Sequence, residues 1–207
     1  MNLIDKFYSN LSKWNIPFFF NFILILHLLG FLSIQFSDID ILRLILTKEY
    51  ILYGELWRCI TFLLIPSSLG FLYLFMFYVF YMIGNSMEDH WGESKFNLYV
   101  LIVYILTIVS TFLAPNNSII PNWYIFSSVF LAFSTIFSDV KFYLFFIIPV
   151  RVKWLGWIKF LYMVIMLAHP GHKWAIISAF MTYILFFSDD ILNIIKRYKR
   201  RINFYGN

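Results

Sequence analysis

Histidine is the residue type in this sequence best suited to acid–base chemistry or to binding a metal ion. His27 lies inside the apolar run 17–36, whereas His90, His169 and His172 lie near the ends of other apolar runs. A single histidine in an apolar helix is expected to be a neutral ring that hydrogen-bonds a neighbouring group. A metal site needs several converging ligands, and no cysteine accompanies His169 and His172. We therefore expect His27 to be structural and the protein to hold no metal.

Other patterns that carry chemistry are missing from the sequence. It contains neither G-x-G-x-x-G nor a P-loop, the motifs that cradle nucleotide phosphates. The apolar runs hold almost no Asp, Glu or Arg, so they lack the paired carboxylates typical of proton pumps and cation channels. The single cysteine, Cys59, excludes an internal disulfide. We expect no cofactor and no nucleic-acid partner.

The composition indicates what kind of scaffold must position any functional residue. Of the 207 residues, 61% are hydrophobic and 13% are charged, whereas soluble domains are about 45–50% apolar and about 25% charged. Aromatic residues make up 23% of the chain, and their rings suit the headgroup region of a bilayer. These values exclude an ordinary soluble domain and indicate an integral membrane protein.

Six apolar segments are predicted to be transmembrane helices, which gives an all-α polytopic bundle. The first is too long for a signal peptide and has no small-residue cleavage site after it. Several of the others are at or below the usual span length of about 17–25 residues, which implies local thinning of the bilayer. The predicted spans are 17–36, 68–84, 96–113, 123–137, 152–168 and 173–188.

The remaining segments divide the chain into three parts. Apolar residues recur at helical spacing in the N-terminal part, 1–16, which predicts an amphipathic helix lying on the membrane surface. The membrane domain, 17–188, includes two segments that do not span. Of these, 37–67 is expected to be a partly embedded loop with a short helix, and 138–153 an interfacial loop. A basic tail, 189–207, completes the chain.

Positive charges predict the topology. With the N-terminus inside, 11 Lys and Arg residues fall on the cytosolic side and four fall outside, which are Arg43, Lys48, Arg58 and Lys173. Lys159 lies within the fifth span and is expected to extend toward the cytosolic end. Both termini are therefore predicted to be cytosolic. The tail is expected to bind anionic lipid through Lys196, Arg197, Lys199, Arg200 and Arg201.

A set of motifs recurs in a fixed order along the predicted spans. The first loop contains W-R-x-x-T, the end of the second span contains G-x-x-x-E-x-x-x-G, and the last span contains a small-xxx-small pair that allows close helix contact. The residues are Trp57, Arg58, Thr61, Gly84, Glu88, Gly92, Ala175 and Ala179.

This arrangement over 17–188 resembles the rhomboid superfamily of six-span membrane proteins, and most closely the derlins and the rhomboid-like proteins of bacteria. The resemblance places Arg58 in the first membrane-embedded loop. Its planar fork favours clamping of loop carbonyls there, with binding of a lipid phosphate as the alternative. Glu88 is expected to cap a helix or to tie the loop to the third span.

The protease members of the superfamily supply a template for a catalytic site. They carry a serine in a G-x-S-x motif at the start of the fourth span and a histidine in the sixth. Here the position of that serine falls near Trp123, while Ser127 and Ser128 lie about one turn deeper. The residues expected to help hold the oxyanion map near Leu72 and Met76, which cannot donate hydrogen bonds. His172 alone matches the pattern.

The resemblance therefore implies a catalytically inactive, derlin-like protein. Its expected role is to bind transmembrane or misfolded membrane-protein clients, as in membrane protein quality control, at a lateral opening near the second and fifth spans. One alternative is an intramembrane serine protease that uses Ser127 or Ser128 with His172, and another is a carrier of small molecules or lipids. The sequence leaves open the oligomeric state and whether the membrane is bacterial or that of the endoplasmic reticulum.

Overall fold

The computed structural model describes residues 18–36, 40–66, 70–144 and 148–188. The predicted surface helix at 1–16 and the basic tail with its five lipid-binding candidates lie outside these residues. The described chain is mostly helical, as the all-α prediction requires. Each of the six predicted segments contains one helix. The helices are α2 (Phe19–Phe36), α5 (Phe71–Trp91), α6 (Glu93–Leu113), α7 (Trp123–Ile136), α8 (Val152–Met166) and a last helix, Lys173–Ser188.

Length and composition single out two of these helices. Within the described ranges, α2 and α6 are long and apolar enough to cross a membrane, whereas α7 and the last helix are apolar but shorter. Two of the helices therefore have the length and apolar character expected of helices that cross a membrane.

The second predicted span ends too early. Helix α5 continues past residue 84 to Trp91, and α6 begins at Glu93 directly after Gly92, whose φ of 79° favours glycine. The polar stretch at residues 85–90 lowers the hydropathy of this region, but polar residues are compatible with a helix that extends beyond the apolar layer. Hydropathy alone therefore located the apolar part of α5 and missed its end.

The predicted interfacial loop contains a β-hairpin, which amends the all-α class. Strand β1 (Lys141–Leu144) pairs antiparallel with β2 (Ile148–Arg151), and Lys141 lies opposite Arg151. Aromatic and β-branched residues in this segment favour strands. Pro149 is tolerated because a two-stranded sheet consists only of edge strands.

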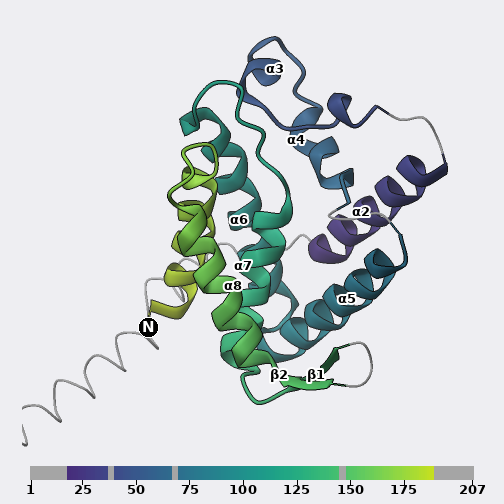
Figure 1. Ribbon diagram of the computed structural model, residues 1–207, viewed down its shortest axis with the longest axis vertical. Helices are drawn as coiled ribbons and strands as arrows, with labels where there is room; N and C mark the ends of the chain where they lie inside the picture. The colour runs from purple at the N-terminus through teal and green to yellow at the C-terminus, as the bar shows by residue number, and fades with distance from the viewer. Residues whose placement is uncertain (1–17, 37–39, 67–69, 145–147, 189–207) are drawn as a thin grey trace, which may run out of the picture.

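The first loop, residues 40–66, is built from several short helical pieces rather than one. They are η2 (Ile41–Arg43), α3 (Lys48–Leu52), α4 (Arg58–Thr61) and η3 (Phe62–Leu64). Figure 1 shows α3 and α4 at one end of the molecule, above the start of α7, with the β-hairpin at the other end. The loop contacts the α6–α7 connection, where the Ile120 amide donates to the Leu46 carbonyl at 3.0 Å.

The connections alternate between the two ends of the bundle. At the end nearer the hairpin, the Phe18 amide donates to the Glu93 carboxylate at 3.1 Å, so α2 begins where α6 begins. At the opposite end, the Asn117 amide donates to the Glu49 carboxylate at 2.7 Å. The helices therefore run alternately up and down, and α2 and α5 both slant away from α7 and α8 (Figure 1).

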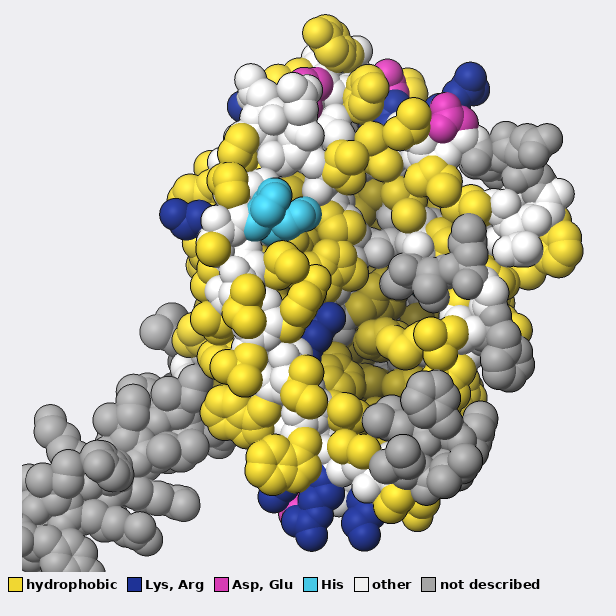
Figure 2. All heavy atoms as spheres, viewed as in Figure 1, with side chains coloured by type: hydrophobic (Ala, Val, Ile, Leu, Met, Phe, Trp, Pro, Cys, Tyr) yellow, Lys and Arg dark blue, Asp and Glu magenta, His cyan; other side chains and the backbone are white. Residues whose placement is uncertain are grey.

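The surface is unusual for a folded chain. Large apolar side chains are exposed along the outward faces of the helices, for example Phe22 on α2, Tyr78 on α5 and Ile165 on α8. Figure 2 shows hydrophobic side chains over the middle of one face, with most charged side chains at the two ends. Apolar patches of this extent mark surfaces that contact protein or membrane.

Candidate functional site

Arg58 closes the first loop on itself. It is 4% exposed, and its Nη1 donates to the carbonyl oxygens of Leu42 at 2.7 Å and Ile45 at 3.1 Å. Its Nε pairs with the Glu55 carboxylate at 2.7 Å, and the guanidinium lies 4.0 Å from the centre of the Tyr50 ring. These contacts are the carbonyl clamp favoured from the sequence. They engage Nε, Nη1 and one face of the guanidinium, and the low exposure of the side chain leaves little surface for a lipid phosphate.

The other two residues of the W-R-x-x-T motif do not join this clamp. Trp57 is 57% exposed and precedes α4, where its ring faces the surroundings. Thr61 has a buried hydroxyl for which the described residues supply no hydrogen-bond partner. The motif therefore lies at the start of α4, and of its three defined residues it is Arg58 that holds the parts of the loop together.

A buried asparagine holds the end of the first loop to the bundle. Asn122 donates from Nδ2 to the carbonyls of Phe62 and Ile65, each at 2.9 Å. His27 of α2 lies beside it, and its Nδ1 is 3.0 Å from the carbonyl oxygen of Leu63. Since a carbonyl only accepts, that nitrogen carries the proton, and His27 is structural as the sequence analysis expected.

No sequence pattern pointed to this role for Asn122. An asparagine directly before an apolar run usually caps the helix by accepting a backbone amide. Here its side chain makes no cap hydrogen bond and turns to the carbonyls of η3 instead. Tyr104 of α6 makes a similar connection that the sequence did not reveal, since its hydroxyl donates to the Cys59 carbonyl at 2.8 Å.

The two candidate serines are committed to other partners. The Ser127 hydroxyl donates to the Trp123 carbonyl in its own helix at 2.6 Å. The Ser128 hydroxyl lies 2.6 Å from the Tyr99 hydroxyl and 3.2 Å from the Ala179 carbonyl. Both serines are buried. The Ser128 contacts join α7 to α6 and to the last helix, whereas the Ser127 contact stays within α7. Neither hydroxyl is placed beside a base as a nucleophile requires.

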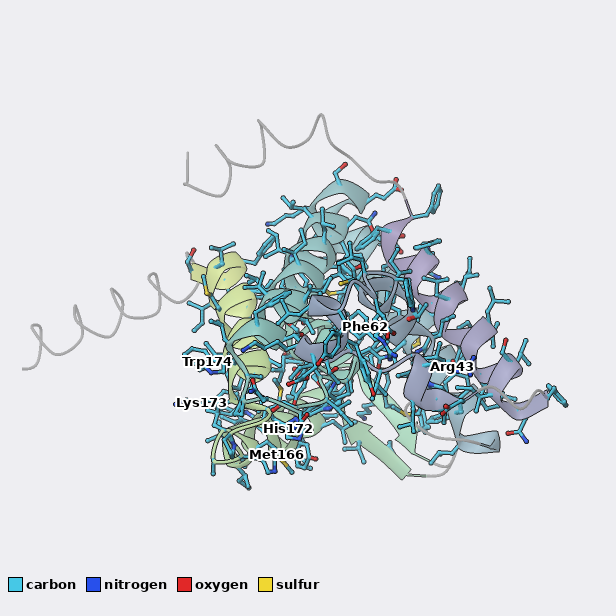
Figure 3. All side chains as sticks on the ribbon, turned by 90° about the horizontal axis from the view of Figure 1, so that it is seen from above. Arg43, Phe62, Met166, His172, Lys173 and Trp174 are labelled. Atoms are coloured by element: carbon cyan, nitrogen blue, oxygen red, sulfur yellow. The ribbon has the colours of Figure 1, made fainter. Side chains whose placement is uncertain are left out.

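His172 is not brought to either serine. Within the described chain, no hydrogen bond joins its ring to Ser127 or Ser128, and its buried Nδ1 has no partner. Its ring contacts are with His169, at 4.7 Å between centroids, and with Tyr124, at 6.0 Å. In the view from above, His172 lies on the side of α8 and the last helix (Figure 3).

His169 and His172 pack against each other just before the last helix. Among the described residues, no third His, Cys, Asp or Glu joins them in a group that could hold a metal ion. The first loop and the α6–α7 connection bring carboxylates near the same end of the molecule, but these are already used in hydrogen bonds, as with Glu49. The pair is therefore an aromatic contact at the start of the last helix.

The G-x-x-x-E-x-x-x-G motif turns out to position helices. A methyl group placed on Gly84 would lie 2.6 Å from the ring of Phe20, so glycine allows α5 to approach α2. Gly92 supplies the positive φ between α5 and α6. Glu88 was expected to cap a helix or to tie the loop to the third span, and its buried Oε1 has no hydrogen-bond partner among the described residues that would support this.

The small residues of the last helix allow it to approach its neighbours. Ala175 and Ala179 are fully buried, and the Ala179 carbonyl accepts the Ser128 hydroxyl of α7. Between them, Ser178 donates to the Leu106 carbonyl of α6 at 3.1 Å. The small-xxx-small pair thus packs the last helix against α6 and α7 within one chain.

A groove opens on the side of the bundle between α5 and α8, with α7 as its floor. Its volume is about 550 Å³, and Figure 2 shows a hollow in the hydrophobic face of the molecule. We call it the lateral groove. Its lining residues are Ile65, Pro66, Met76, Phe80, Pro121, Asn122, Trp123, Phe126, Ser127, Phe130, Lys159 and Tyr162.

Few polar groups are free in the lateral groove. Asn122 is occupied by loop carbonyls and Ser127 by its own helix. Met76, mapped from the resemblance to an oxyanion-holding position, lines the groove with an apolar side chain, and Leu72 is exposed on the same helix. The groove can therefore contact an apolar ligand, but it presents no arrangement for acyl transfer.

Lys159 is the basic residue of the groove. Its ammonium lies 4.4 Å from the centre of the Trp123 ring and 5.9 Å from that of Tyr162. The side chain points toward the start of α7, away from the end that the predicted topology assigns to the cytosol and toward which it was expected to extend. Trp123 is the first residue of α7, whereas the α7 end near the hairpin is joined to α8 through the Val152 amide and the Val140 carbonyl. A cation–π contact explains the direction that the side chain takes.

Comparison with known proteins found no matching family model, no similar curated protein and no similar solved structure. The rhomboid resemblance therefore depends on the sequence motifs alone.

Proposed function

We propose that this chain is a six-span membrane protein of rhomboid-like architecture that binds transmembrane segments of other proteins without cleaving them. The observation that carries the proposal is the lateral groove, because it opens sideways between α5 and α8. These are the second and fifth of the six helices, where the sequence analysis expected a lateral opening. An opening in this direction admits a helix from within the bilayer.

The membrane setting is supported by the surface and by the path of the chain. The helices expose large apolar side chains outward, and charged residues gather at the two ends of the face in Figure 2. Helices α2 and α6 are of spanning length and hydropathy. The alternating connections fit six passes with both termini on one side, and the 11-to-4 charge count assigns that side to the cytosol.

The absence of catalysis is inferred from the geometry of the candidate residues. A serine nucleophile needs a base within hydrogen-bond reach and donors for the developing oxyanion. Ser127 and Ser128 have other partners, His172 faces His169 and Tyr124, and Met76 cannot donate. A role that needs binding alone, such as the capture of misfolded membrane-protein clients in quality control, fits this arrangement.

Binding can be tested with the purified full-length chain in lipid nanodiscs and a fluorescent single-span peptide. A Met76→Trp variant narrows the groove, whereas Leu74→Trp adds the same bulk to a residue of α5 that does not line it. The two positions are matched, with exposures of 41% and 46%. We expect Met76→Trp to weaken peptide binding at least about fivefold and Leu74→Trp to leave it unchanged. Equal effects of the two variants would contradict a binding site in the groove.

The same samples test the protease alternative. After incubation the peptide is expected to remain intact by mass spectrometry, and a fluorophosphonate probe is expected to leave the protein unlabelled. Cleavage that disappears in the His172→Ala variant would reverse the assignment and make the chain an intramembrane serine protease.

A further inference from the structure

Lys159 is the one charged residue among the described residues that line the lateral groove. It is the middle residue of α8, which runs from Val152 to Met166. The pairs of opposite charge found in the described chain are Arg58 with Glu55 and Arg151 with Asp139. Lys159 therefore has no carboxylate partner among the described residues, and its ammonium meets only aromatic faces.

A lone ammonium in an apolar groove creates an affinity for anions. Charges attract more strongly where the surroundings are apolar than in water. A carboxylate on a transmembrane helix is similarly costly when it lies alone in the bilayer. Pairing the two relieves both costs at once, provided that they meet at the same depth.

The depth of Lys159 favours a carboxylate on a helix over a lipid headgroup. Its ammonium is level with Trp123, the first residue of α7. That level lies beneath the first loop, because α4 lies above the start of α7 (Figure 1) and Asn122, which precedes Trp123, donates to the loop carbonyls of Phe62 and Ile65. A lipid phosphate would have to descend past this loop, whereas a side chain on a transmembrane helix reaches the level directly.

We propose that the lateral groove selects transmembrane helices that carry an Asp or Glu side chain at the level of Lys159. This inference rests on the proposed function and adds a substrate class to it. The apolar walls contributed by α5 and α7, including Phe80 and Phe130, contact the body of the client helix. Lys159 then distinguishes clients with an intramembrane carboxylate, which are the helices most in need of a partner.

The test uses the full chain in nanodiscs of neutral phosphatidylcholine and a series of single-span peptides. Each peptide carries one Glu at a successive helical turn, and each is paired with a control that has Gln at the same place. We expect at least one Glu peptide to bind about tenfold more tightly than its Gln control. Lys159→Gln should abolish this preference, and Lys159→Glu should transfer it to a peptide with Lys at that position. Lys153→Gln, on the same helix but outside the groove, should keep it.

The outcomes separate this inference from the proposed function. Equal binding of all Glu and Gln peptides would overturn the carboxylate selectivity and leave client binding in place. No binding of any peptide would overturn both. Loss of the Glu preference when an anionic phospholipid is added would show that Lys159 binds lipid phosphate, which would also overturn the inference. The thermal unfolding midpoint of each variant establishes that it is folded.

Discussion

At the scale of the residue, Arg58 and Asn122 explain how a polar loop is held against an apolar bundle. The loop carbonyls near these residues would otherwise be buried without partners, which costs about 1–3 kcal/mol for each group. The guanidinium satisfies two of them within the loop, and the Asn122 amide satisfies two more across to α7. The loop is therefore fixed from both sides.

Replacing Arg58 tests the first of these clamps. Arg58→Ala is expected to lower the free energy of unfolding by about 1.5–3 kcal/mol, the range for hydrogen bonds to a charged group. Arg58→Lys should restore only part of this, because lysine lacks the planar fork. The measurement is the thermal unfolding midpoint in detergent. Arg43→Ala serves as control, since Arg43 is exposed in the same loop. Equal midpoints for both alanine variants would argue against the clamp.

Glu49 predicts a pH dependence. Its carboxylate accepts the Asn117 amide at 2.7 Å, and this backbone hydrogen bond lowers the pKa of Glu49 in the folded protein. A lowered carboxyl pKa stabilises the fold fully above the unfolded value of about 4.3, and this contribution disappears as the pH falls through the folded value. We expect the wild-type melting temperature to fall more steeply than that of Glu49→Gln below about pH 4.3. Parallel curves would exclude this role for Glu49.

At the scale of the element, hydropathy predicted where the helices are and poorly predicted how they end. Apolar runs located all six, but the polar end of α5 and the hairpin at 141–151 were missed, since neither is an apolar run of helical length. Among site residues, the role of Arg58 could be predicted, because the planar fork of an arginine in an embedded loop suits hydrogen bonds to nearby backbone carbonyls. Asn122 could not, because its position before α7 is equally typical of a helix cap.

The lateral groove could be anticipated only from the family resemblance. Its existence depends on the slant of α5 relative to α7 and α8, and helix tilt is set by tertiary packing. Gly84 contributes to that packing because it lets α5 approach Phe20. No local sequence pattern specifies how far the N-terminal end of α5 then diverges from α7 and α8.

A double-mutant cycle tests the contact between α2 and α5. Gly84→Ala is expected to destabilise the protein by about 1–3 kcal/mol, since the added methyl group overpacks the interface. In a Phe20→Leu background the same substitution should cost less, because the ring that it would meet is gone. Unfolding midpoints of the four proteins give the coupling. Strictly additive effects would show that Gly84 and Phe20 do not limit the approach of the helices.

At the scale of the whole molecule, the short helices bear on how a client enters. Helices α7 and α8 have 14 and 15 residues, which correspond to about 21–23 Å at 1.5 Å per residue. The hydrocarbon core is about 30 Å thick. In the proposed six-span topology the bilayer would therefore be thinned on this side of the molecule. Thinning at the mouth of the groove lowers the cost of bringing a polar residue of a client to Lys159.

The topology itself predicts the location of reporters. An enzyme reporter that is active only in the cytosol should be active when fused after Asn207 and inactive when inserted after Asn117, in the α6–α7 connection. The reason is the 11-to-4 distribution of positive charges. An insertion after Asp139, beside the hairpin, should be active again and serves as an internal control. Activity at Asn117 with none at Asn207 would invert the proposed orientation.

The most direct test of client binding is site-specific photo-crosslinking to a single-span peptide in nanodiscs. A photoreactive residue is placed at Met76 or Tyr162, on opposite walls of the groove, and at Leu74 or Leu161 as neighbours that do not line it. The exposures of Tyr162 and Leu161 are 45% and 54%, so access to lipid is similar. We predict strong crosslinks to intact peptide from Met76 and Tyr162 and weak ones from Leu74 and Leu161. Crosslinks of equal yield at all four positions, or a cleaved peptide, would contradict the account.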